Sequence, residues 1–119
     1  MTKFYEFNQN NSGGSFHFDE EAGITHFVIV EANNANQANA LAEAIGIYFD
    51  GCNDGRDCDC CGDRWYEQWR EDAGNDVPSI YGEPVVNATA YHKWMDDGKE
   101  IVVHYLDGRK EWFGVQTKK

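Results

Sequence analysis

Short apolar runs separated by polar turns make up the first third of the chain. Aromatic residues predict short strands at 4–7 and 16–18, and a run rich in β-branched residues predicts a clearer strand at 25–30. The stretch 8–15 between the first two strands contains only polar residues and glycine, which is typical of a long loop. We expect the strands at 16–18 and 25–30 to pair through a turn at residues 20–23.

One helix is predicted after these strands. Asn34 suits the N-cap position, and Gln37 follows at the spacing of a capping box. Small and aliphatic residues recur at helical intervals from Ala35 to Ile45, which gives a narrow apolar face that can lie close on a sheet. Gly46 is a typical C-terminal stop. The pattern therefore predicts a helix between Asn34 and Gly46.

Residues 50–84 lack the hydrophobic periodicity of a helix or a strand. The segment carries four cysteines, many aspartates and glycines, and few aliphatic residues. A short helical stretch is expected at 65–70, and residues 73–83 are expected to form a loop. Long irregular segments in compact domains are usually functional or cross-linked, so we expect something other than an apolar core to order this one.

The last third of the chain is predicted to be a β-meander. Strand-like alternation covers 90–95, 100–106 and 111–115, and the hairpin dipeptides Asp97-Gly98 and Asp107-Gly108 lie between them. Both faces of the middle strand are partly apolar, which predicts a central position in its sheet.

These elements predict an α+β fold. It consists of an antiparallel sheet of about five to six strands, one main helix packed on it and an irregular Cys-rich excursion. The length of 119 residues suits a single domain, residues 1–119, with the Cys-rich insertion at about 50–84. Hydrophobic residues make up 41% of the chain and aromatic residues 14%, which is enough for a packed core and too much for a disordered chain.

The charge of the chain is strongly negative and uneven. There are 21 acidic and 10 basic side chains, for a formal net charge of −11, and the excess of acids lies before residue 85. This balance argues against binding a long nucleic acid through a basic face. The acids form either a solvated surface that aids solubility or an acidic face that docks on a basic protein as a nucleic acid would.

The cysteines give the sharpest chemical signal. Cys58 and Cys61, followed by Gly62, form the C-x-x-C-G step with which zinc knuckles direct two thiolates at one ion. Cys52 and Cys60 could complete a set of four ligands from the same loop. The separated second C-x-x-C of a zinc ribbon is absent, so reduced, partly buried thiols remain the alternative to a structural zinc ion.

No catalytic constellation is apparent. The four histidines lie on predicted strands, where core or edge positions explain them, and no metalloprotease, phosphate-loop or nucleophile-elbow motif occurs. Aspartates surround the cysteines and disfavour a reactive thiolate. A cysteine-dependent hydrolase or redox protein is therefore the least favoured function, and we expect a protein that is not an enzyme.

Two segments carry the chemistry of a binding site. A loop of small polar residues and glycines offers backbone N–H groups suited to a phosphate, and a guanidinium beside two rings is suited to phosphate contact and base stacking. The alternative is an ordinary hairpin loop and a structural arginine–aspartate contact. The candidate ligand-binding residues are Asn10, Asn11, Ser12, Gly13, Gly14, Ser15, Arg64, Trp65 and Tyr66.

The sequence predicts a cytoplasmic location. The first residues turn polar at once, so they do not read as a signal peptide, and the longest apolar run, 27–30, is far too short to span a membrane. No lipidation signal is apparent at either end.

Several blocks together resemble a family of small proteins of tailed bacteriophages. The most specific are FYEFNQNNSGGSF at 4–16 and CDCCGDRWY at 58–66, and the likeness covers most of the chain. The resemblance implies expression in an infected bacterium, where small accessory proteins often counter host defence. We therefore expect a non-enzymatic binding protein that sequesters a small phosphate-bearing ligand, in a homo-oligomer whose subunits share the site. The alternative is an acidic inhibitor of a host defence protein.

Overall fold

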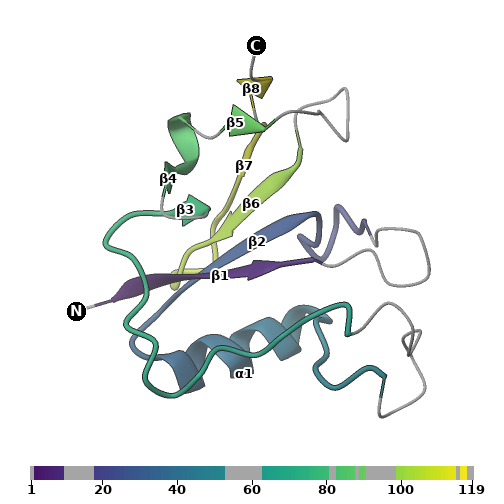
Figure 1. Cartoon of the computed structure of the whole chain (residues 1–119), viewed down its shortest axis with the longest axis vertical. Coiled ribbons are helices and arrows are strands. Elements are labelled where there is room, and N and C mark those ends of the chain that lie inside the picture. Colours follow the sequence, from purple (N-terminus) through teal and green to yellow (C-terminus); the bar gives the residue numbers. More distant parts are fainter. Residues whose placement is uncertain are drawn as a thin grey trace.

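The computed structural model describes residues 2–9, 18–52, 63–80, 83–87, 89–90, 99–114 and 116–117 (Figure 1). These residues form an α+β fold around a four-stranded sheet and one α-helix. The sheet consists of β1 (Lys3–Asn8), β2 (Phe27–Ala32), β6 (Ile101–His104) and β7 (Lys110–Phe113), and the helix is α1 (Ala35–Ile45). Smaller elements are β3 (Ser79–Ile80), β4 (Glu83–Pro84), a 3-10 turn η2 (Val85–Asn87), β5 (Thr89–Ala90) and β8 (Gln116–Thr117).

The main sheet is mixed, with the order β1-β2-β6-β7. The pairs β1–β2 and β6–β7 are antiparallel, whereas β2 and β6 are parallel. The prediction of a purely antiparallel sheet is therefore wrong. A parallel pair needs a long crossover, and here the chain between β2 and β6 includes α1. Two short pairs, β3–β4 and β5–β8, form separate two-stranded sheets.

The predicted helix and its caps are confirmed. The Asn34 side chain accepts a hydrogen bond from the Gln37 backbone N–H at 2.8 Å, and the Gln37 side chain accepts one from the Asn33 N–H at 2.6 Å. Gly46 ends the helix with φ at 115°, a left-handed conformation that favours glycine. No helix in the described ranges is long and apolar enough to cross a membrane.

The strand predictions are confirmed where local signals are strong. Strand β1 contains the predicted 4–7, β2 begins two residues later than predicted, and β6 is central and followed by a turn at Asp107-Gly108. The turn at 20–23 also forms, closed by backbone bonds of 2.9 Å between Asp19 and Ile24. However, β2 pairs with β1 and β6, and Phe18 is not in a strand. Phe16, His17 and most of the predicted strand 90–95 lie outside the described residues.

The two faces of the sheet carry separate apolar clusters, because alternate side chains of each strand point to opposite sides. On the helix side, Val28 and Val30 of β2 and Val102 of β6 pack with Ala38 and Ala42 of α1. The other face carries an apolar cluster that includes Phe27, Ile29, Ile101, Val103, Ile80 and Val85. Figure 1 shows α1 on one side of the sheet and β3, β4 and η2 on the other.

Residues 63–78, here called the 63–78 segment, run past α1 and the free edge of β1 (Figure 1). Asn39 and Gln68 exchange two hydrogen bonds of 2.7 and 2.9 Å, and Phe4 and Asn75 exchange two backbone bonds of 2.8 Å. The predicted helix at 65–70 is absent from this described segment. The backbone of the 63–78 segment instead forms hydrogen bonds with the Asn39 side chain of α1 and with the edge of β1. These bonds order the segment without the local hydrogen bonds of a helix.

Candidate functional site

Arg64 is held at the end of β1. Its Nη1 donates a hydrogen bond to Oε1 of Gln9 at 2.8 Å. Gln9 is itself fixed, because its Nε2 donates to the Thr25 carbonyl at 2.9 Å and its backbone N–H donates to the His26 carbonyl at 2.8 Å. The guanidinium therefore lies beside the residue that directly precedes the candidate loop. The loop residues Asn10, Asn11, Ser12, Gly13, Gly14 and Ser15 lie outside the described residues.

Trp65 occupies a different environment from its neighbours. It is only 1% exposed and belongs to the helix-side cluster, where it packs with residues such as Phe7 and Ile24. A ring in that position cannot stack on a ligand base without leaving the core. Its contribution to a site is to fix the backbone between Arg64 and Tyr66.

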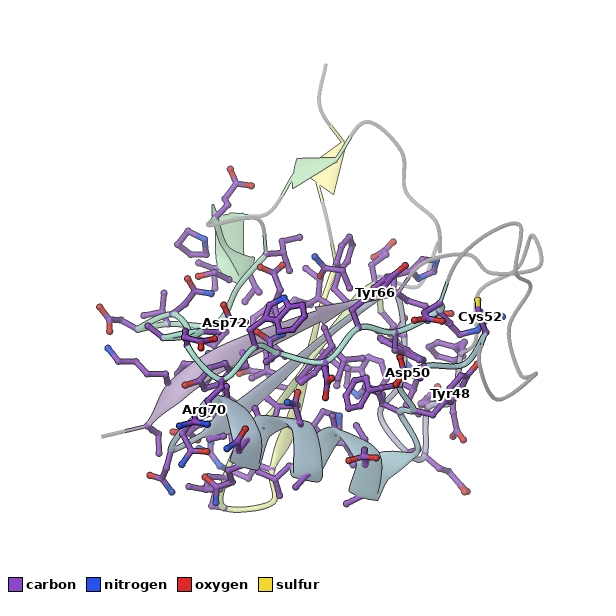
Figure 2. All side chains as sticks on the ribbon, turned by 60° about the horizontal axis from the view of Figure 1, so that its bottom comes forward. Tyr48, Asp50, Cys52, Tyr66, Arg70 and Asp72 are labelled. Carbon is purple, nitrogen blue, oxygen red and sulfur yellow. The ribbon has the colours of Figure 1, made fainter. Side chains whose placement is uncertain are left out.

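Tyr66 and Trp69 are exposed aromatic residues on the 63–78 segment. Tyr66 is 59% exposed and Trp69 is 72% exposed, and both line a depression of about 270 Å³ beside Asp50. Figure 2 shows Tyr66 on the segment, with Tyr48, Asp50 and Cys52 on the neighbouring loop and Arg70 and Asp72 farther along. The sequence places Trp69 in the predicted helical stretch 65–70 as a residue that could order the cysteine loop, and its exposure could not be predicted from that pattern.

Cys52 lies at the entrance to the cysteine-rich stretch. It is half-buried, and its backbone N–H donates to Oδ1 of Asp63 at 3.0 Å. This bond joins the two residues that flank positions 53–62. Cys58, Cys60 and Cys61 lie outside the described residues. Within the ranges that are described, no group of three histidine, cysteine or acidic side chains could hold a metal ion, so the zinc site remains a prediction.

The two histidines in the described ranges are largely enclosed. His26 is 7% exposed and lies immediately before β2. Burial lowers the pKa of His26 below its ordinary value of 6.5, while the negative charge of Glu100 opposes that shift. Burial also lowers the pKa of His104, against the opposing effect of its bond to Gly23 and with a further lowering by Lys110. Both histidines therefore favour their neutral form in the folded protein.

This burial predicts a loss of stability in mild acid. An unfolded histidine gains its proton near pH 6.5, whereas the folded one resists protonation, so the free energy of unfolding should fall as the pH drops through that value. Urea denaturation at pH 7.5 and 5.5, above the range in which exposed carboxylates titrate, should show this fall. The fall should become smaller in His26→Gln and in His104→Gln. If both variants keep the pH dependence of the wild type, the explanation is wrong.

Comparison with known protein families gives a match over nearly the whole chain. A family model described as a domain of unknown function, DUF7296, matches residues 2–119. No curated protein and no solved structure matches the chain. Since the family model covers nearly the whole length, the chain belongs to the DUF7296 family.

Proposed function

We propose that this chain is a non-enzymatic binding protein that holds a small phosphate-bearing, nucleotide-type ligand. The observation that carries the proposal is the hydrogen bond from Arg64 to Gln9, because it brings a guanidinium to the base of the loop Asn10–Ser15. A guanidinium matches the geometry of a phosphate, and backbone N–H groups in a glycine-rich loop complement its charge. Arg64 thus contacts the residue that directly precedes the loop proposed for binding.

The aromatic residues have different parts in the proposed site. Tyr66, with an exposed ring one residue beyond Trp65, is available to stack on a base. Trp65 is a positioning residue, because its buried ring fixes the chain on which Arg64 and Tyr66 lie. The proposed contacts are therefore the loop for phosphate, Arg64 for phosphate and Tyr66 for the base.

The proposed biological context comes from the resemblance to small proteins of tailed bacteriophages. In that context the protein acts in the cytoplasm of the infected bacterium and sequesters a nucleotide-type signal of a host defence system. A homo-oligomer whose subunits share the site is part of the proposal. The acidic net charge of −11 is compatible with it, because a small anion needs one or two well-placed cations and not a basic face.

Isothermal titration calorimetry with AMP, adenosine and inorganic phosphate tests the proposal. AMP should bind more tightly than either of its two parts, and Arg64→Ala should weaken AMP binding by about 10- to 100-fold, the range for loss of a charge-assisted hydrogen bond. Arg70→Ala is the matched control, because Arg70 is exposed and lies well away from Tyr66 on the same segment (Figure 2). Equal affinity of the wild type and Arg64→Ala for AMP would contradict the proposal.

A structural zinc ion bound by Cys52, Cys58, Cys60 and Cys61 is proposed as the element that orders the cysteine-rich stretch. The bond from Cys52 to Asp63 supports a closed loop at this place. We expect one zinc per chain by elemental analysis, and a chelator should lower the melting temperature because the metal binds only the folded chain. Cys52→Ser should reduce the zinc content. Four titratable thiols and an unchanged melting temperature after chelation would show reduced cysteines instead.

A second candidate function is an acidic inhibitor of a host defence protein. The observation that favours it is the exposure of Tyr66 and Trp69 beside the exposed acids Glu67, Glu71 and Asp72. Aromatic residues dominate the energetics of protein interfaces, and surrounding acids would select a basic partner. Under this function Arg64→Ala leaves partner binding intact, whereas acid-to-amide changes on the 63–78 segment weaken it.

A further inference from the structure

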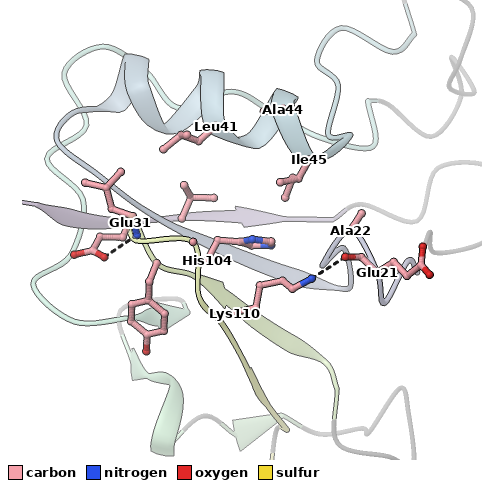
Figure 3. A pocket seen from close by; sticks show the side chains of 12 residues that line it. Glu21, Ala22, Glu31, Leu41, Ala44, Ile45, His104 and Lys110 are labelled. Carbon is pink, nitrogen blue, oxygen red and sulfur yellow. Dashed lines mark hydrogen bonds between the residues drawn. The ribbon is translucent and has the colours of Figure 1, made fainter.

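One cavity in the described ranges is distinct from the Arg64 site. It measures about 520 Å³ and lies between the C-terminal half of α1 and the sheet, beside the β6–β7 turn (Figure 3). Its walls are largely apolar and include Val30, Leu41, Ala44, Ile45 and Leu106. A volume of this size falls in the range of small-molecule sites, and an apolar lining with a few polar groups is their usual composition.

His104 forms part of the wall on the sheet side. It is the last residue of β6, and Figure 3 shows its imidazole in the space between the strand and α1. Its Nε2 lies 2.7 Å from the carbonyl oxygen of Gly23. Because a carbonyl oxygen only accepts, Nε2 carries the proton, and Nδ1 of the neutral ring is the acceptor.

Lys110 brings a positive charge to the same cavity. Its Nζ donates to the backbone carbonyl of Glu21 at 2.7 Å, and Figure 3 shows the Glu21 carboxylate turned away from it. Within the described residues Lys110 makes no ion pair, unlike Lys99, which pairs with Glu20 at 2.9 Å. The ammonium group therefore has no carboxylate of the described chain to neutralise it.

Glu31, the acid on the opposite side of the cavity, is already engaged. Oε1 accepts from the Leu106 backbone N–H at 2.9 Å, and Oε2 accepts from the Thr2 hydroxyl at 2.6 Å. Both oxygens thus serve to hold the β6–β7 turn and the N-terminal strand. The cavity therefore has apolar walls, one cation that makes no ion pair within the described residues, and two carboxylates. The Glu21 carboxylate is turned away from Lys110, and the Glu31 carboxylate is bonded to Leu106 and Thr2.

We propose that this cavity binds a small amphipathic anion, a carboxylate with an aliphatic body of medium length. The aliphatic body lies against Leu41, Ile45 and Val30, and the carboxylate pairs with the Lys110 ammonium beside His104. The charge on Lys110 selects an anion over a neutral compound of the same shape, and the apolar walls select an aliphatic body over acetate. The site is independent of Arg64.

NMR titration of the full chain with octanoate tests the proposal. We expect saturable binding of one octanoate per chain, with shifts at the methyl groups of Leu41 and Ile45 and at the His104 ring. 1-Octanol should bind at least about 10-fold more weakly, in line with the loss of a charge-assisted interaction, and acetate should give no saturable shift. Arg64→Ala should bind octanoate as the wild type does, so failure of the proposed phosphate site would not change this result.

Variants separate the parts of the proposal. Lys110→Met keeps the aliphatic stem and should lower octanoate affinity to that of 1-octanol, whereas Lys99→Met, the control, should leave it unchanged. Ala44→Phe should fill the cavity and abolish binding of both compounds, with circular dichroism showing that the variant is folded. The proposal is overturned if Lys110→Met binds octanoate normally or if the shifts fall outside the cavity. It is equally overturned if these methyl signals respond only to protein concentration, which would indicate a second copy of the chain.

Discussion

Replacing Trp65 with alanine should lower the free energy of unfolding by about 3–5 kcal/mol, the range for removing a large aromatic side chain from a core. Trp65 is 1% exposed and is the largest of the fully buried side chains in the described residues. It joins the 63–78 segment to the cluster under α1. Loss of its ring would leave a cavity and would release the segment that positions Arg64. Urea denaturation followed by far-ultraviolet circular dichroism measures the effect.

Trp69→Ala is the control for this prediction. The two tryptophans are four residues apart on the same segment, but Trp69 is 72% exposed. Its removal should change the free energy of unfolding by no more than about 0.5 kcal/mol, as is usual for exposed positions. Equal losses in the two variants would contradict the placement of Trp65 in the core.

Gly23→Ala should have the second large effect, a loss of about 2–5 kcal/mol. Gly23 has φ at +79°, and a Cβ atom there would lie 2.5 Å from Cε1 of His104 and 2.7 Å from its Nε2. The substitution therefore adds a steric clash to the strain of a left-handed backbone. Because the added Cβ atom displaces the His104 ring, the variant should also shift the NMR resonances of that ring.

Gly108→Ala separates the two causes. Gly108 also has a positive φ, +97°, but a Cβ atom there would meet nothing within 4 Å. This variant should lose only the backbone contribution, about 1–2 kcal/mol. Chemical denaturation of both variants compares them directly. If they lose equal stability, the close approach of His104 to Gly23 is not the cause.

Elements with complete local signals could be predicted from the sequence. The helix was predicted with both ends because the caps Asn34 and Gly46 and the repeat of small residues all indicate the same boundaries. The β6–β7 hairpin was predicted because Asp107-Gly108 fixes a turn between two alternating runs. In each case the interactions that decide the structure join residues close in the sequence.

The parts that were missed depend on contacts between distant residues. The parallel pairing of β2 with β6 places Phe27 opposite Ile101. The sequence of neither strand indicates which strand it pairs with. The helix predicted at 65–70 does not form, because the backbone N–H of Gln68 bonds to the Asn39 side chain of α1 instead. Tertiary contacts therefore override weak local preference.

The candidate site shows the same division. Residue types suggested Arg64 as a phosphate ligand, but its contact with Gln9 spans 55 positions and could not be predicted. The burial of Trp65 was hidden because its neighbours in the sequence are polar or charged. The cavity beside Lys110 was missed entirely, since its walls come from α1, β2 and the β6–β7 hairpin.

The central claim is that the chain holds a small phosphate-bearing ligand through Arg64. Native mass spectrometry of the full chain recovered from phage-infected bacteria tests it most directly. We predict a fixed stoichiometric mass increment that is released on denaturation as a phosphate-containing compound and is lost in Arg64→Ala but kept in Arg70→Ala. A spectrum with a stoichiometric partner polypeptide and no small ligand would contradict the claim.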